Sequence, residues 1–131
     1  MPRRFSPYPT EAELEVLNVL WRRGSGTVRE VHETLQADRT TRLTTTLKIL
    51  QIMTQKRLVI CSDSRPHQFT AAVPERKTQA GLVDRLAKQA FDGSVQKLLV
   101  RAVEDGELSG KELGEIRKLI DNLRKGKKGN K

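Results

Sequence analysis

The chain has 131 residues and a formal net charge of +9, with 25 Lys and Arg residues against 16 Asp and Glu residues. This length allows one core of ordinary size, or a small domain with an appendage, and disfavours a large enzyme with an enclosed pocket. The positive charge makes a polyanion, either nucleic acid or an anionic membrane, the first partner to consider.

No apolar run approaches the ~20 residues that span a bilayer, and the N-terminus lacks the apolar block of a signal peptide, so we expect a cytoplasmic protein. With one cysteine, Cys61, and two histidines, His32 and His67, the chain has neither a disulfide framework nor a four-ligand zinc set. We predict no metal site and no cofactor.

Two segments hold the excess of positive charge. Residues 38–67 contain six bases and two acids, and residues 124–131 contain five bases and no acid. Residues 1–37 and 68–123 are balanced. The first basic segment indicates a surface for a polyanion, and we predict that the basic tail 124–131, which has no apolar residue, is disordered.

The first predicted helix begins after Thr10 and Glu13, which fit a capping box: the threonine oxygen accepts a bond from a free helix amide, and the glutamate returns one. Apolar residues at helical spacing predict a helix over about residues 11–23, ended by Gly24 in a left-handed turn. Trp21 lies in this stripe and is predicted to pack in the core.

The second and third helices follow at once. Thr27 and Glu30 repeat the capping box and predict a short helix with an apolar stripe at Val28, Val31 and Leu35. The third helix is predicted to bury Leu43, Leu47, Leu50 and Met53. Its opposite side presents groups suited to base edges and phosphates, namely Thr44, Thr45, Lys48, Gln51 and Ile52. Ile52 fits a thymine-methyl contact or the edge of the core equally well.

A β-hairpin is predicted next, because residues 58–61 are apolar and β-branched, residues 62–66 are turn-like and residues 67–70 can return as a partner strand. Three helices followed by a hairpin are typical of a winged helix-turn-helix domain. Arg65 at the hairpin tip is a candidate for a phosphate or minor-groove contact, and Arg29 and Arg42 are candidates for phosphate contacts near helix starts.

After Pro74 the sequence predicts three amphipathic helices. Their apolar stripes include Leu82, Leu86, Phe91, Leu98, Leu99, Val103, Leu113, Ile116, Leu119 and Ile120. About fifty residues of this kind bury such stripes poorly alone, so we predict a dimerisation domain completed by a second copy.

The predicted fold is therefore mainly α with a small β-hairpin. It comprises a winged-helix DNA-binding domain over residues 8–73, a three-helix dimerisation domain over residues 74–123, and the basic tail.

Cys61 and His67 raise the question of a nucleophilic dyad. Cys61 continues an apolar strand, where a cysteine behaves as a small hydrophobe, and no orienting group or oxyanion loop is evident. We predict no catalytic residue and no enzyme activity.

Several stretches of the sequence together match the pattern of one known family. At the N-terminal end they are residues 9–17 through Trp21, and then Thr27-Val28-Arg29-Glu30-Val31. Further along they are Thr44-Thr45, Leu47, Leu50, Lys56, Leu58-Val59, Phe91-Asp92-Gly93-Ser94 and the stretch from Glu107 to Leu119. Over about residues 8–123 the sequence thus resembles the penicillinase-repressor family, the BlaI/MecI/CopY group. The resemblance implies a dimeric winged-helix repressor of a dyad operator, often of β-lactam resistance or metal homeostasis genes.

At several positions the sequence departs from the family pattern, and these departures limit which family properties we expect of this chain. Ile52 stands where the family often has Arg, and Arg57 where it often has Gly, so the operator sequence does not transfer. The family's release from DNA commonly follows cleavage by a membrane-bound sensor metalloprotease. The corresponding point falls near Arg101-Ala102, which lacks the usual Asn-Phe pair, and no Cys-x-Cys pair of the copper-responsive branch follows Cys61.

We therefore expect a homodimeric repressor of a palindromic operator, controlling β-lactam resistance or stress and transport genes. Two alternatives stay open. One is a basic RNA- or ribosome-associated protein that uses the same winged-helix face. The other is a dimerisation partner that does not bind DNA.

Overall fold

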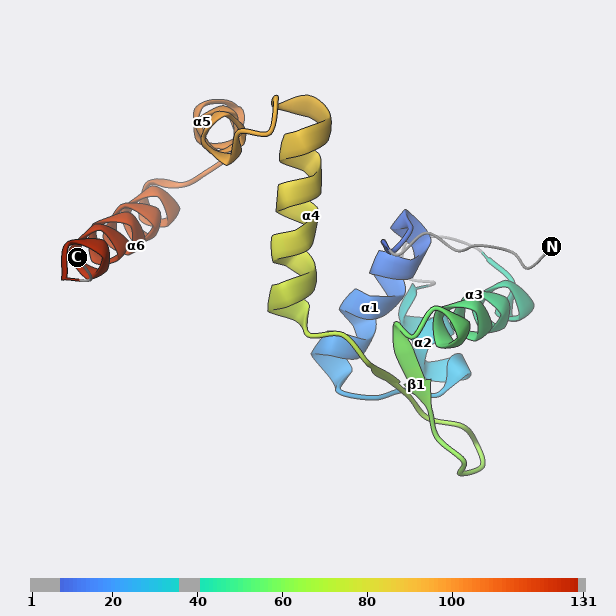
Figure 1. Cartoon of the computed structure of the whole chain (residues 1–131). Helices are drawn as coiled ribbons and strands as arrows, with labels where there is room; N and C mark the ends of the chain where they lie inside the picture. The colour runs from blue at the N-terminus through green and yellow to red at the C-terminus, as the bar shows by residue number, and fades with distance from the viewer. Residues whose placement is uncertain (1–7, 36–40, 130–131) are drawn as a thin grey trace. The chain divides into compact units, whose positions relative to one another are not determined.

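The computed structural model describes residues 8–35 and 41–129 of the chain. Within these residues it confirms a mainly helical fold with one small hairpin (Figure 1). Two compact units are present, and the border between them lies between Gln79 and Ala80.

The N-terminal unit contains three helices and the hairpin. The helices are α1 (Glu11–Arg23), α2 (Val28–Leu35) and α3 (Leu43–Gln55), and the strands are β1 (Val59–Cys61) and β2 (Phe69–Ala71). Figure 1 shows the three helices gathered together and the hairpin loop extending away from them. This order of elements is that of a winged helix-turn-helix domain.

The two strands pair antiparallel, with Ile60 opposite Thr70. The second edge of β2 is also paired, because the backbone groups of Phe69 and Gly26 exchange two hydrogen bonds of 2.8 and 3.0 Å. The loop before α2 therefore adds a third backbone partner to the hairpin. This pairing fixes the base of the hairpin against the helices.

One apolar core joins all these elements. Its buried members are Val16, Leu17, Val19, Leu20, Val31, Leu50, Met53, Leu58, Val59 and Phe69. Trp21 packs against this core as predicted, and Cys61 also packs there, half-buried, as a strand residue.

The helix starts predicted from capping boxes are confirmed. The Thr10 hydroxyl accepts a bond from the Glu13 amide at 3.2 Å, and the Glu13 carboxylate accepts one from the Thr10 amide at 2.9 Å. The same reciprocal bonds start α2 and α6, at Thr27–Glu30 and Ser109–Glu112. Gly24 ends α1, as predicted, with a positive φ of 88° that favours glycine, although its ψ of −45° differs from that of the predicted left-handed turn.

The end of α3 is a Schellman motif built without glycine. The amide of Leu58 donates to the carbonyl of Met53 at 2.9 Å, and the amide of Arg57 donates to that of Thr54 at 3.1 Å. Arg57 takes the left-handed position with φ 65°. Glycine is favoured at this position of a Schellman motif because a Cβ atom is strained in the left-handed region.

The remaining helices are α4 (Glu75–Ala90), α5 (Val95–Asp105) and α6 (Gly110–Gly129). The Ser94 hydroxyl caps α5 by accepting a bond from the Lys97 amide at 3.1 Å. The tail was predicted to be disordered from residue 124, whereas α6 continues to Gly129; residues 130 and 131 of this tail lie outside the described residues. Lys and Arg have good helix propensity, and cations interact favourably with a helix C-terminus.

Candidate nucleic-acid interface

One side of α3 is polar and exposed. Thr44, Thr45, Lys48 and Gln51 are all exposed, as their spacing predicted, and we call these four residues the α3 polar face. Ile52 is half-buried at its margin. Hydroxyl, amide and ammonium groups on one exposed helix side can hydrogen-bond to base edges and phosphates in a groove of duplex DNA.

The buried side of α3 differs from the predicted one. Thr46, Leu50 and Met53 are fully buried, whereas Leu43 is half-buried and Leu47 is 37% exposed. The prediction that Leu47 lies in the core was therefore wrong. Residues 46, 50 and 53 share one helix side, so the helix is turned toward a buried threonine and away from Leu47.

The buried Thr46 has a polar partner on α2. Its hydroxyl shares a 2.8 Å hydrogen bond with Nδ1 of His32, which is half-buried. A threonine hydroxyl removed from water needs such a partner. Sequence reasoning missed this pair because a threonine in a helix gives no sign of which side it will occupy.

A second polar contact holds the end of α3 to α1. Nζ of Lys56 lies 2.6 Å from Oε1 of Glu13, and both side chains are almost completely buried, with exposed fractions of 5% and 6%. The same ammonium donates to the carbonyl of Tyr8 at 3.3 Å. Because Lys56 is enclosed and paired, it adds no outward charge to the basic segment.

The hairpin turn presents Arg65 on an ordered loop. Arg65 is exposed at the tip. Behind it, the Ser62 hydroxyl accepts a bond from the Gln68 amide at 2.8 Å, and Nδ1 of His67 donates to the Ser62 carbonyl at 2.7 Å. The Ser62 amide donates in turn to the Gln68 carbonyl at 2.8 Å. These bonds close the turn around the arginine.

The bond from His67 also bears on the dyad hypothesis. Because a carbonyl only accepts, Nδ1 of His67 carries a proton. Sγ of Cys61 lies 3.5 Å from the Ser62 carbonyl oxygen. Both side chains therefore contact backbone of the turn, which is a structural role.

The two remaining arginine candidates lie near helix starts. Arg42 is the N-cap residue of α3 and Arg29 lies in the first turn of α2, and both are exposed. In the same turn of α2, the Thr27 backbone amide donates to Glu30 and lowers the pKa of that carboxyl below its usual 4.5. The Arg23 guanidinium, 2.8 Å from the Glu30 carboxylate, lowers this pKa further.

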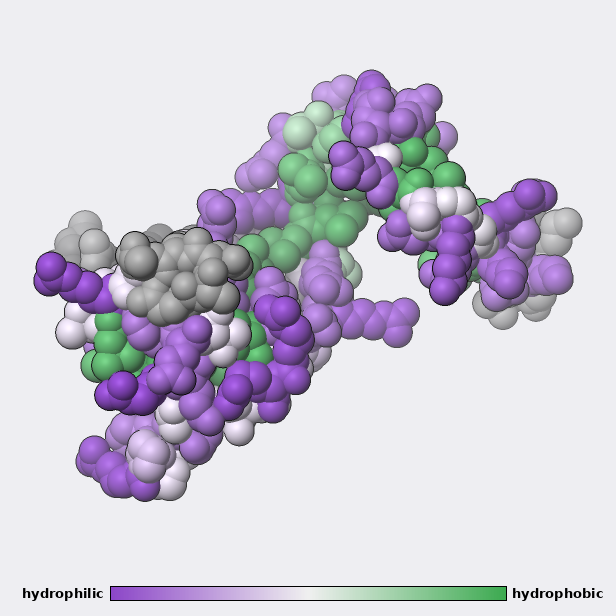
Figure 2. Space-filling view, turned by 180° about the vertical axis from the view of Figure 1, so that it is seen from behind, coloured by the Kyte–Doolittle hydropathy of each residue, from purple (hydrophilic) through white to green (hydrophobic). Residues whose placement is uncertain are grey.

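The C-terminal helices expose much of their apolar surface, as Figure 2 shows. Six of the ten residues predicted to mediate dimerisation are exposed: Leu86, Leu99, Val103, Leu113, Leu119 and Ile120. The other four, Leu82, Phe91, Leu98 and Ile116, are half-buried. Val83, Val95, Val100 and Leu123 add to the exposed apolar surface.

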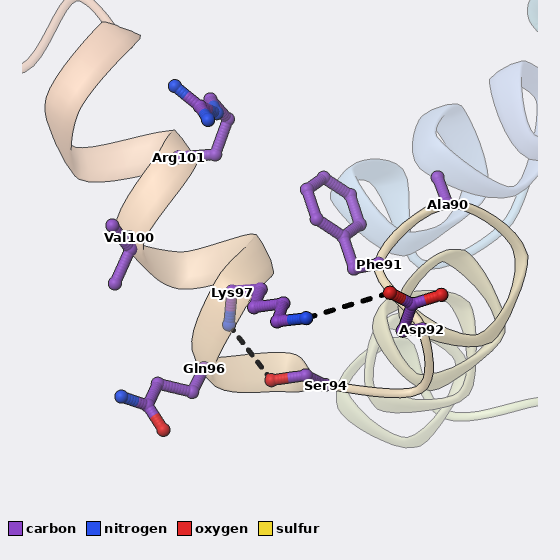
Figure 3. Close-up of a pocket in the computed structure, with 8 residues that line it drawn as sticks. All are labelled: Ala90, Phe91, Asp92, Ser94, Gln96, Lys97, Val100 and Arg101. Carbon is purple, nitrogen blue, oxygen red and sulfur yellow. Dashed lines mark hydrogen bonds and ion pairs between the residues drawn. The ribbon is translucent and has the colours of Figure 1, made fainter.

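An open hollow of about 590 Å³ lies between the end of α4 and α5 (Figure 3). The Phe91 ring points into it, and Lys97 lies 3.6 Å from the Asp92 carboxylate beside it. In the described part of the chain, no three His, Cys, Asp or Glu side chains gather to hold a metal ion. None of the helices in residues 8–35 and 41–129 could span a membrane.

Comparison with known proteins identifies relatives along nearly the whole chain. The model of the penicillinase repressor family matches residues 9–122. The protein named transcriptional regulator BlaI from Mycobacterium tuberculosis, in strains CDC 1551 and H37Rv, is 36% identical over 119 residues. That alignment covers 88% of this chain and 85% of the relative.

Solved structures of two regulators are also similar. A MarR family transcriptional regulator from Silicibacter pomeroyi has a TM-score of 0.44 and 21% identity, over 88% of this chain and 68% of its own. BpsR from Bordetella bronchiseptica has a TM-score of 0.42 and 17% identity, over 88% of this chain and 75% of its own.

The family match extends from the first capping box into α6, so it includes the winged helix and the C-terminal helices alike. This family consists of transcriptional regulators rather than enzymes. The chain belongs to the penicillinase-repressor family and is a transcriptional repressor.

Proposed function

We propose that two copies of this chain bind a palindromic operator in duplex DNA, each with its α3 polar face in the major groove, and block the promoter. The observation that carries this proposal is the exposure of Thr44, Thr45, Lys48 and Gln51 on the third helix of a winged helix in a repressor family. A promoter-binding role places the protein in the cytoplasm.

Each side chain of the interface has a proposed partner. Gln51 and the two threonines read base edges, the threonine methyls pack on thymine methyls, and Lys48 contacts phosphate or guanine. Ile52, half-buried beside them, adds an apolar contact to a thymine methyl. Arg65 enters the minor groove or contacts phosphate, and Arg29 and Arg42 contact phosphates.

The second copy is proposed to cover the apolar surface of α4, α5 and α6. Apolar side chains such as Leu99 and Leu119, with exposed fractions of 54% and 58%, lose contact with water when two such surfaces meet. A two-fold pair places two α3 helices in successive major grooves, about 34–36 Å apart. The operator would therefore be a dyad.

Selection from a random duplex library tests the proposal directly. We expect the full chain to enrich a palindrome whose half-sites are about one helical turn apart. Gel shifts on the full site and on one half-site then compare dimer with monomer binding. Equal affinity for all duplexes would overturn the proposal.

Two further experiments test the alternative functions, one with a competing RNA and one with charge-reversal variants. If structured RNA displaces the selected duplex at equal concentration, the RNA-associated function holds instead. If charge reversal at Lys48 and Arg65 leaves the protein's function intact, the winged-helix face does not act through DNA, and the chain is a dimerisation partner that does not bind DNA.

Proteolytic release is not part of this proposal. Arg101 and Ala102 lie inside α5, and the Arg101 guanidinium pairs with Asp105 at 3.0 Å one turn later. Cleavage there by a membrane-bound sensor metalloprotease would require local opening of the helix. Incubation with such a protease, if one is encoded nearby, would show whether this bond is cut. Neighbouring genes would also indicate whether β-lactam resistance, stress or transport is regulated.

A further inference from the structure

Two polar residues in the described part of the chain are buried as whole residues, backbone included, and both hold the same helix. They are Glu13 and Thr46, whose whole-residue exposures are 5% and 1%. Thr46 belongs to α3 and bonds to His32 of α2, whereas Glu13 belongs to α1 and bonds to Lys56 at the C-cap of α3. The buried polar contacts of this core therefore meet on the helix that carries the α3 polar face.

The two contacts hold α3 near its two ends. Thr46 lies in the first turns and Lys56 directly after the last, about 15 Å apart along the axis at 1.5 Å per residue. One contact reaches α2 and the other α1, so α3 is held from two directions. Thr46 also directly follows Thr44 and Thr45, and any rotation that breaks its bond to His32 turns these two residues as well.

Polar contacts of this kind constrain direction more than they stabilise the fold. A buried ion pair contributes little net stability compared with apolar residues of similar volume, because its charges lose their hydration. Apolar packing alone tolerates small rotations of a helix, whereas a hydrogen bond needs defined distance and angle. The 2.6 and 2.8 Å contacts therefore suit a helix whose exact orientation matters.

We propose that the His32–Thr46 and Glu13–Lys56 pairs are positioning contacts that fix the orientation of α3 against the major groove and so set the protein's discrimination among DNA sequences. This inference rests on the proposed function. None of the four side chains needs to touch DNA, and Lys56 is too enclosed to reach a phosphate.

The experiment compares affinity for the duplex selected by the wild-type chain with affinity for a scrambled duplex of the same composition. Thr46→Val removes the hydroxyl at nearly constant volume. The double variant Lys56→Met with Glu13→Gln removes both charges, while the Gln amide oxygen still accepts from Thr10. Each change should lower the ratio of the two affinities at least about fivefold, mainly by weakening the selected complex.

Three further variants separate orientation from stability. Thr46→Ser keeps the hydroxyl, and His32→Asn keeps a polar atom where Nδ1 lies, so both should retain most of the discrimination. Val19→Ala opens a cavity in the core beside Leu35 and leaves both polar contacts in place. It should lower the unfolding temperature and keep the affinity ratio close to that of the wild type.

Lys56→Met supplies a second readout. The slope of log affinity against log salt concentration should equal that of the wild type, because an enclosed, paired lysine releases no DNA counterion. A smaller slope would mean that Lys56 contacts phosphate and would overturn its assignment as a positioning residue.

The outcomes keep this inference distinct from the proposed function. A wild-type chain with no duplex preference would overturn both. A wild-type preference that Thr46→Val and the double variant retain, or that Val19→Ala reduces equally, would overturn the positioning role alone. If Thr46→Val does not fold, His32→Leu makes the same test from α2, where the side chain is only half-buried.

Discussion

Nε1 of Trp21 donates a 3.0 Å hydrogen bond to the backbone carbonyl of Val73, 52 residues further along the chain. Trp21 lies on α1, and Val73 lies between β2 and the start of α4. Both side chains pack against the core of the winged helix. The bond thus closes the N-terminal unit by fastening the segment that leaves the hairpin to the first helix.

Replacing this tryptophan tests the contribution of that bond. Trp21→Phe keeps an aromatic ring in the core but leaves the Val73 carbonyl without its indole donor. We expect the free energy of unfolding to fall by about 1 kcal/mol. Denaturant unfolding monitored by circular dichroism measures this free energy. Tryptophan fluorescence does not serve, because the variant lacks the chain's one tryptophan. An unchanged midpoint would show that water replaces the indole without cost.

Arg57 offers a stabilising substitution. At φ 65° its Cβ atom is strained, and Arg57→Gly removes that strain while giving the unfolded chain more freedom. The net gain should be about 0.5–1 kcal/mol in the free energy of unfolding. Arg57→Ala is the matched control, because it removes the same charge but keeps Cβ, and should give no gain. Equal effects of both changes would assign the result to charge.

The capping box of α2 predicts a dependence of stability on pH. The amide of Thr27 and the guanidinium of Arg23 hold the pKa of Glu30 below 4.5 in the folded protein. This carboxylate therefore stabilises the fold above pH 4.5, and its contribution is lost as the pH falls through the lowered pKa. Glu30→Gln should make thermal stability fall less steeply below pH 4.5, and a slope equal to the wild type would contradict this.

Replacing Lys48 should change the salt dependence of DNA binding. If its exposed ammonium neutralises one phosphate, Lys48→Ala should reduce the slope of log affinity against log salt by about 0.9. Lys111→Ala removes the same charge from the first turn of α6 and should leave the slope unchanged. A fall in sequence preference with no change in slope would instead assign Lys48 to a base contact.

The exposed leucines of the C-terminal helices predict the oligomeric state. Leu99→Lys and Leu119→Lys place charges on the surface proposed to face the second copy, and each should shift the protein from dimer to monomer in sedimentation experiments. Binding to the full palindrome should weaken together with dimerisation. Glu115→Lys, a charge change at a polar residue of α6, should remain dimeric. Dimers of both leucine variants would locate the interface elsewhere.

Much of the fold could be predicted from the sequence because the residue patterns that specify its helices are local. Thr10 and Glu13 predict the start of α1 since the two bonds of a capping box join residues three positions apart. Gly24 predicts the end of α1 because glycine readily takes a positive φ, and this preference depends on that residue alone. The exposure of Thr44 and Lys48 likewise follows from helical periodicity and the polarity of their side chains.

What the tertiary structure alone decided is which residues meet between elements. Nothing in the sequence pairs Glu13 with Lys56, 43 residues away, or sends Thr46 inward and Leu47 outward. Helical periodicity shows which residues share a side of a helix, but it does not fix how the helix is rotated against its neighbours. In α3 the observed rotation buries the Thr46 hydroxyl where His32 can hydrogen-bond to it. Local bonds therefore determined the elements of this repressor, and packing between distant segments determined how its third helix is held.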